Sequence, residues 1–154
     1  LNTYYPDYIK ADDSVWPLAG VPVKTGKPLT DCGWEVHPQG MYDILKWIND
    51  RYAPQKIIIT ENGTASRDWV NVDGKVEDVN RIDYLRRYLA EVHHAIQDGV
   101  PVMGYYIWCF CDNFEWARGL SIRFGIVYVD YKTQQRIPKE SAYWYAKTIE
   151  NNGF

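Results

Sequence analysis

Two short apolar runs constrain the fold of this chain more than any other feature of its sequence. Lys56–Thr60 and Val102–Cys109 are rich in β-branched and aromatic residues and have the length of buried strands. Between them, Val79–Gln97 carries apolar residues at helical spacing and is followed by Gly99, a residue that commonly ends helices. A polar loop follows each strand. This order is typical of βα units in a parallel sheet.

The remaining segments extend the same alternation. Apolar spacing predicts one helix over residues 38–51 and another over residues 139–151. Residues 1–5 are expected to form the end of a strand, and a short strand is expected at 126–129. Residues 6–33 are rich in Pro, Gly and Asp, which predicts a long loop.

Acidic residues follow both predicted strands. Glu61 comes directly after the first strand, and an acid-bearing loop follows Trp108 at the end of the second. In parallel α/β folds the chemistry lies at the carboxyl ends of the strands. No Gly-rich phosphate-binding motif follows either strand, so a doubly wound nucleotide-binding sheet is disfavoured. The pattern favours a barrel.

Composition excludes several classes of function. The chain has 154 residues, 46% of them hydrophobic, which is enough for one domain with a core. Its 17 basic and 20 acidic residues are interspersed, so it lacks the basic stripe of a nucleic-acid-binding protein. No apolar run reaches the roughly 18 residues of a membrane span. Without a visible targeting signal, a cytoplasmic location is expected.

Three cysteines argue against a disulfide framework, because their number is odd. Cys109 and Cys111 are expected on one face of a strand, where free cysteines usually act as small hydrophobic residues. No second Cys or His pair with metal-ligand spacing lies near them, so no metal site is predicted. The other charged and aromatic residues have simpler interpretations: Trp34 fills core space, residues 67–87 form a solvated loop and helix face, and Asp112 bonds loop backbone.

Several motifs resemble those of one family. "ITENG" at 59–63, "DNFEW" at 112–116 and "RFGIVYVDY" at 123–131 are similar to the C-terminal part of glycoside hydrolase family 1, the retaining β-glucosidases and their relatives. The similarity continues through residues 33–45, 78–85, 95–108 and 138–145. It implies an α/β fold, the (β/α)8 TIM barrel, in which residues 1–154 form a C-terminal fragment of one catalytic domain containing the sixth to eighth strands with their helices.

The resemblance also implies catalytic roles. Glu61 matches the family's nucleophile, which forms a covalent glycosyl ester. Tyr4, in "NTY", matches the tyrosine that orients this carboxylate, although Thr3 replaces the usual aromatic residue. A strand end is a rigid support for a nucleophile that must meet one carbon atom.

Four further residues match the family's sugar-binding positions. Trp108 would stack beneath the sugar ring, Glu115 would accept hydrogen bonds from two hydroxyls, and Trp116 would donate one from its indole. Phe124 would line the rim near the exocyclic carbon. Aromatic faces combined with a charged acceptor suit a hexose, which has apolar faces and polar edges. An acid at position 115 favours a neutral glycoside over a phosphorylated one.

The chain lacks one group that the implied reaction requires. A retaining glycosidase needs a second carboxyl group about 5 to 5.5 Å from the nucleophile. The family carries it in an Asn-Glu-Pro motif, and no Asn-Glu dipeptide occurs in this sequence. We therefore expect a β-glycosidase that needs the N-terminal part of the barrel, with the isolated chain inactive and no cofactor required. Two alternatives remain: a self-associating half-barrel, and a noncatalytic sugar-binding module.

Overall fold

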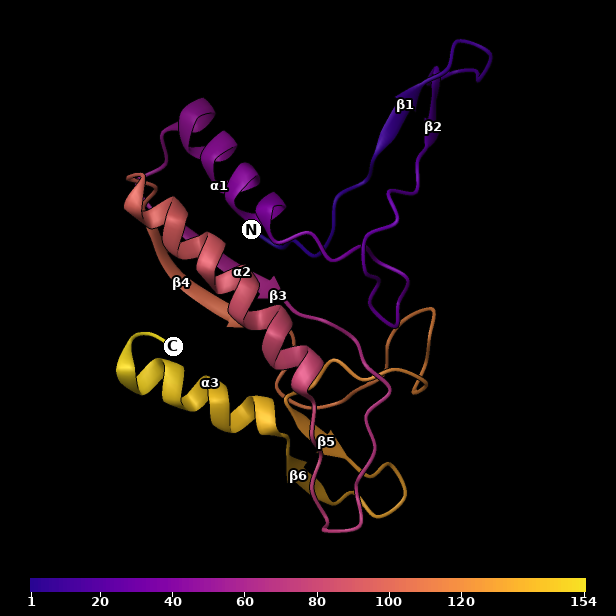
Figure 1. Cartoon of the computed structure of the whole chain (residues 1–154), viewed down its shortest axis with the longest axis vertical. Coiled ribbons are helices and arrows are strands. Elements are labelled where there is room, and N and C mark those ends of the chain that lie inside the picture. Colours follow the sequence, from indigo (N-terminus) through magenta and orange to yellow (C-terminus); the bar gives the residue numbers. More distant parts are fainter.

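A computed structural model describes residues 1–154 as three helices beside a small parallel sheet, with long loops gathered at one end of the strands (Figure 1). In chain order the elements are β1 (Ile9–Ala11), β2 (Gly20–Pro22), α1 (Gln39–Tyr52), β3 (Ile57–Asn62), α2 (Val79–Gln97), β4 (Val102–Ile107), β5 (Val127–Val129), β6 (Arg136–Pro138) and α3 (Glu140–Asn151).

The predicted parallel arrangement is confirmed. Strands β3 and β4 pair in parallel, and α2 forms the crossover between them. The first residues of the chain lie along the other edge of β3, where the amino group of Leu1 donates to the carbonyl of Ile58 at 2.9 Å. Asn2 forms a parallel bridge with Glu61. The leading segment therefore lies beside β3, as a strand end would, but it forms only this isolated bridge and no strand of its own.

The helices cover only one face of this sheet. Ile57 and Ile59 are buried in the main core. Their core neighbours come from α1, α2 and the turn before β4: Met41, Leu45, Tyr84, Leu85, Tyr88, Val92, Ala95 and Val100. On β3 and β4, Ile58, Met103 and Tyr106 are 44%, 65% and 62% exposed. The prediction of strands buried on both faces is therefore wrong for this chain by itself, since no layer covers the second face.

Two hairpins interrupt segments expected to be largely irregular. Strands β1 and β2 pair antiparallel within residues 6–33 and project away from the helices (Figure 1). The connection between them exposes Trp16 and Leu18 almost completely. Strand β5, at the expected position, pairs antiparallel with β6, which was not expected. None of the three helices has the length and apolar character needed to cross a membrane.

Candidate active site

An extra residue in β3 determines which way Glu61 faces. Ile59 pairs with Tyr105 and Asn62 pairs with Ile107, so β3 advances three residues while β4 advances two. With strict alternation, Glu61 would share the helix-covered face of Ile59. The bulge lets Asn62 occupy that face instead, and bulges commonly re-aim a side chain beside an active site. The predicted strand end at Thr60 is therefore two residues early.

The buried amide of Asn62 fixes this irregularity. Its Nδ2 donates to the carbonyl of Thr3 at 2.7 Å and to the hydroxyl of Tyr84 at 3.1 Å. The hydroxyl of Tyr105 donates to its Oδ1 at 2.6 Å. With the amide satisfied from three directions, Glu61 remains half-buried on the opposite side.

Tyr4 holds the carboxylate of Glu61. Its hydroxyl donates to Oε2 of Glu61 at 2.9 Å, while Oε1 makes no hydrogen bond. Burial raises the pKa of Tyr4, and the hydrogen bond to the negative Glu61 raises it further, so the phenol stays protonated. The arrangement leaves one carboxylate oxygen fixed and the other available to attack an electrophile.

Gly63 lets this end of β3 lie against the end of β4. A Cβ atom at position 63 would lie 2.0 Å from the carbonyl oxygen of Trp108. The close approach is also a hydrogen bond, because the amide of Trp108 donates to the carbonyl of Asn62 at 2.9 Å. Only glycine can occupy position 63 here without moving the backbone.

Trp108 in turn contacts the second predicted acid. Its Nε1 lies 3.4 Å from Oε1 of Glu115 and donates to it, and the peptide bond between Trp108 and Cys109 is cis. Glu115 begins a tight turn, with its amide donating to the carbonyl of Gly119 at 2.8 Å. Trp116 lies next in this turn and is 92% exposed. The structure thus joins Trp108 to Glu115 and leaves the indole of Trp116 facing solvent.

Phe124 is not at an open rim, contrary to expectation. Its side chain is 2% exposed, with ring centroids 6.2 Å from Tyr4 and 5.8 Å from Trp34. Trp34 also lies 5.4 Å from Tyr4 and stacks on Tyr5 at 4.8 Å. Trp34 therefore fills core space, as predicted, but that core is the support of Tyr4. Tyr4 and Trp108 both pack against one buried cluster, so the same core supports the Tyr4–Glu61 pair and the Trp108–Glu115 pair. The members of the cluster are Cys32, Ala65, Cys109, Ile122 and Phe124.

Cys32 and Cys109 belong to the buried cluster beside Tyr4 and Trp108, and their free thiols are poor nucleophiles. Burial raises the pKa of Cys32 to about 11. Burial and the nearby carboxylate of Asp112 raise the pKa of Cys109 to about 12. Both therefore remain protonated at neutral pH, and all three cysteines are free. The carboxylate of Glu61 is the better candidate nucleophile.

The expected solvated face over residues 67–87 is partly wrong. Asp68, Asp78 and Arg81 are buried in ion pairs. Asp112 does bond loop backbone as expected, accepting from the amides of Gly125 at 3.1 Å and Val129 at 3.3 Å.

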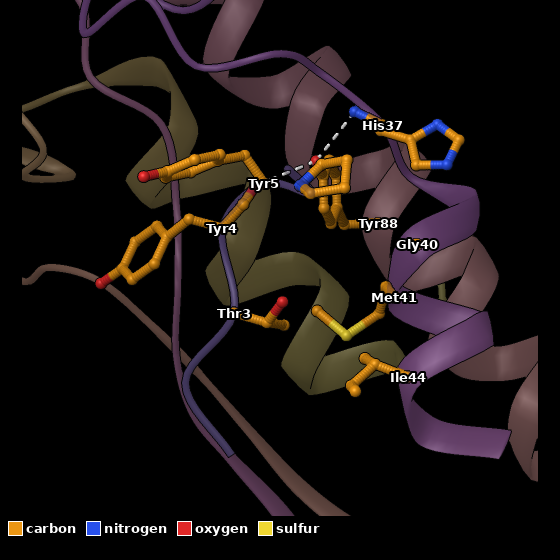
Figure 2. A pocket seen from close by; sticks show the side chains of 9 residues that line it. Thr3, Tyr4, Tyr5, His37, Gly40, Met41, Ile44 and Tyr88 are labelled. Carbon is orange, nitrogen blue, oxygen red and sulfur yellow. Dashed lines mark hydrogen bonds between the residues drawn. The ribbon is translucent and has the colours of Figure 1, made fainter. Parts of the chain in front are cut away.

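A cavity of about 210 Å³ lies between the leading segment and α1 (Figure 2). Thr3, Met41 and Ile44 line it, and the amide of His37 donates to the hydroxyl of Tyr88 beside it at 3.1 Å. Figure 2 shows the ring of Tyr4 turned away from Met41 and Ile44. This cavity is therefore separate from the Glu61 carboxylate.

Comparisons of the sequence and of the structure with known proteins agree on one family. The sequence profile described as Glycosyl hydrolase family 1 matches residues 2–154. The chain belongs to this family. A 1,4-beta-D-glucan glucohydrolase of Thermotoga neapolitana is 53% identical over 153 residues, which are 99% of this chain and 34% of that protein. A 6-phospho-beta-galactosidase of Leptotrichia buccalis is 46% identical over 124 residues, 80% of this chain and 26% of that protein.

Solved family 1 structures have the same fold. The family 1 β-glucosidase of Thermotoga maritima matches with a TM-score of 0.96 at 49% identity, over 99% of this chain and 34% of that one. The same enzyme has been solved in complex with deoxynojirimycin. The α/β elements of this chain are therefore part of a family 1 TIM barrel. The chain spans about a third of the length of these relatives.

Proposed function

We propose that this chain supplies the nucleophile and part of the sugar-binding site of a retaining β-glucosidase. The observation that carries the proposal is the hydrogen bond from Tyr4 to Glu61, which fixes one carboxylate oxygen and leaves the other free. The rest of the barrel supplies the acid/base carboxyl group. The isolated chain is then inactive.

The reaction has two displacements. Oε1 of Glu61 forms a bond to the anomeric carbon as the bond from that carbon to the aglycone oxygen breaks. The departing oxygen takes a proton from the second carboxyl group. The same group then removes a proton from water, which attacks the anomeric carbon and releases Glu61. Two inversions at one carbon give net retention of configuration.

The sugar-binding residues favour a neutral substrate. The indole of Trp108 offers an apolar surface to a sugar face, and Glu115 accepts hydrogen bonds from neighbouring hydroxyls. We propose β-glucosides as substrates, with β-galactosides and β-fucosides as secondary ones. Comparing an aryl β-glucoside with its 6-phosphate tests this, because the negative Glu115 repels phosphate when their charges are close. Faster hydrolysis of the phosphorylated compound would contradict the assignment.

We also propose that the chain corresponds to the last third of the barrel, so that the acid/base residue precedes it. Two chimeras with the Thermotoga maritima enzyme test this directly. Replacing the last third of that enzyme with this chain should give a glucosidase, whereas replacing its first third should not. Activity of only the second chimera would place the chain at the other end.

The first chimera can also be used to test the role of Glu61 as the nucleophile. Glu61→Gln in it should abolish turnover of an aryl glucoside while leaving the binding of glucose, a neutral ligand, largely intact. Near-normal turnover by Glu61→Gln would contradict the proposed role of Glu61. Turnover by the 154-residue chain alone would contradict the need for a second carboxyl group from elsewhere.

The open sheet face favours one alternative, self-association. Ile58, Met103 and Tyr106 present apolar surface that the remainder of the barrel would otherwise cover. Sedimentation of the isolated chain at increasing concentration tests whether a second copy of the chain covers this face in place of the remainder of the barrel. A stable oligomer that is also catalytically active would favour self-association over barrel completion.

A further inference from the structure

A buried ionic network lies at the loop end of the sheet. Lys139, directly before α3, is at its centre: its Nζ lies 2.5 Å from Oδ2 of Asp68 and 2.8 Å from Oδ1 of Asp112. Arg81 pairs with Asp68 at 2.8 Å. Arg123 pairs with Asp112 at 2.6 Å. A shared ammonium thus joins two carboxylates that each have a second cation.

The network is balanced in charge. Arg81 also pairs with Asp78, which accepts from the amide of Ser141 at 2.8 Å. Three cations face three anions, and the side chain of Lys139 is 0% exposed. Burial and the neighbouring Arg81 lower the pKa of Lys139, and Asp68 and Asp112 oppose that change. Removing a single charge from such a site leaves an unpaired buried partner.

Lys139 joins the loops that follow β3 and β4. Asp68 is in the loop after Glu61, and Asp112 is in the loop between Trp108 and Glu115. Both carboxylates contact the same ammonium. The loop that follows the strand of the proposed nucleophile and the loop that carries the proposed sugar-binding acid therefore have a common anchor.

A chain of contacts also links Asp112, a partner of Lys139, to Tyr4. Asp112 accepts from the amide of Gly125 at 3.1 Å, and a Cβ at position 125 would lie 2.2 Å from the amide nitrogen of Asp112. Phe124 precedes this glycine and packs edge-on against Tyr4. A displacement of Asp112 would consequently move the support of the Tyr4–Glu61 pair as well as the loop of Glu115.

We propose that Lys139 is a positioning residue for catalysis, holding the loop that follows β3, the strand of Glu61, and the loop of Glu115 in a fixed relative position through Asp68 and Asp112. This inference rests on the proposed function. Lys139 is completely buried and acts through its two carboxylate partners. The competing interpretation is that the network only stabilises the fold.

A charge-balanced double variant separates these roles. In the full-length enzyme containing this chain, Lys139→Met with Asp68→Asn removes the tie between the loops. The pairs Arg81–Asp78 and Arg123–Asp112 remain, each with one cation and one anion. Lys46→Met is the matched control, because Lys46 forms an exposed ion pair with Asp50 on α1.

The readout is the rate per competent site. A 2-deoxy-2-fluoroglucoside with a good leaving group traps the covalent ester and counts the competent sites in each preparation. We expect the double variant to show kcat/KM per titrated site lowered about 10- to 100-fold, since small misplacements of reacting groups have effects of that size. Lys46→Met should match the parent enzyme.

Each other result has a definite meaning. A double variant that gives fewer titrated sites but a normal rate per site overturns the proposal in favour of a structural role, and so does one that fails to fold. If the parent enzyme hydrolyses glucosides without being labelled, the proposed function fails instead. If the parent enzyme and the double variant are both labelled and have equal kcat/KM per titrated site, the positioning role of Lys139 is overturned and the proposed function stands.

Discussion

Tyr4 and Glu61 are 57 residues apart in sequence, and the hydroxyl of Tyr4 donates a hydrogen bond to Oε2 of Glu61 across 2.9 Å. The pair forms because the leading segment runs in parallel beside β3 and because the bulge in β3 turns Glu61 away from α2. The bond sets the orientation of the carboxylate and leaves Oε1 without a hydrogen-bond partner.

Removing this hydrogen bond should slow the reaction without unfolding the enzyme. In the full-length enzyme, Tyr4→Phe should lower kcat/KM roughly 10- to 100-fold, because a hydrogen bond to a charged group contributes about 1.5–3 kcal/mol. Tyr42→Phe is the matched control, since Tyr42 donates to Oδ2 of Asp98 on the exposed surface. Steady-state kinetics with an aryl glucoside measure both. Equal activity of the two variants would contradict the role of Tyr4.

Position 63 should not accept a side chain. Gly63→Ala would place a Cβ against the carbonyl oxygen of Trp108, so the ends of β3 and β4 must separate. We expect a loss of about 3 kcal/mol of unfolding free energy, the upper end of the usual cost of overpacking, because backbone cannot relax as a flexible side chain does. Gly153→Ala, whose Cβ would meet only the carbonyl of Asn151 at 3.9 Å, should be neutral. Urea unfolding of the full-length variants measures the difference, and equal stabilities would refute the close approach.

The pH dependence of stability should include a contribution from His37. Burial lowers the pKa of His37 below its ordinary value of 6.5, and the ammonium of Lys27, 2.7 Å from Nδ1, lowers it further. Asp43 and Glu35 oppose this shift. The folded state therefore favours the neutral imidazole. Its stabilisation is present above pH 6.5 and is lost as the pH falls through the lowered folded-state pKa.

His37→Asn tests that contribution, because asparagine keeps an acceptor for Lys27 and does not titrate. Thermal unfolding of the full-length parent and variant should be followed from roughly pH 7.5 down to pH 5. The parent should lose stability relative to the variant over this range. A constant difference between the two melting temperatures would show that the neutral imidazole is not selected by folding.

The long elements of the fold could be predicted from the sequence. The apolar spacing of Val79–Gln97 gives α2 at its observed bounds, and α1 and α3 begin and end within one residue of expectation. These helices are periodic enough for the core face to be recognised. Strands β1, β2 and β6 have three residues each, and β2 and β6 contain Gly or Pro, so none of them carries a comparable signal.

The site was only partly predictable for a related reason. A carboxylate at a strand end can be recognised in the sequence. Its contact with Tyr4 was predicted only from the family resemblance. The contact also depends on the bulge in β3, for which the local sequence gives no signal. Asp68 resembles a solvated loop residue because its partner Lys139 is 71 residues away. Phe124 has the residue type expected at a sugar rim, and only its packing against Tyr4 and Trp34 shows that it is buried.

The most direct measurement is to identify the residue that forms the covalent intermediate. The full-length enzyme containing this chain is incubated with a 2-deoxy-2-fluoroglucoside, digested, and its peptides are sequenced by mass spectrometry. We expect one sugar adduct, carried by Glu61 in the peptide that contains "ITENG". An adduct on any other carboxylate, or hydrolysis of glucosides by an enzyme that never becomes labelled, would contradict it.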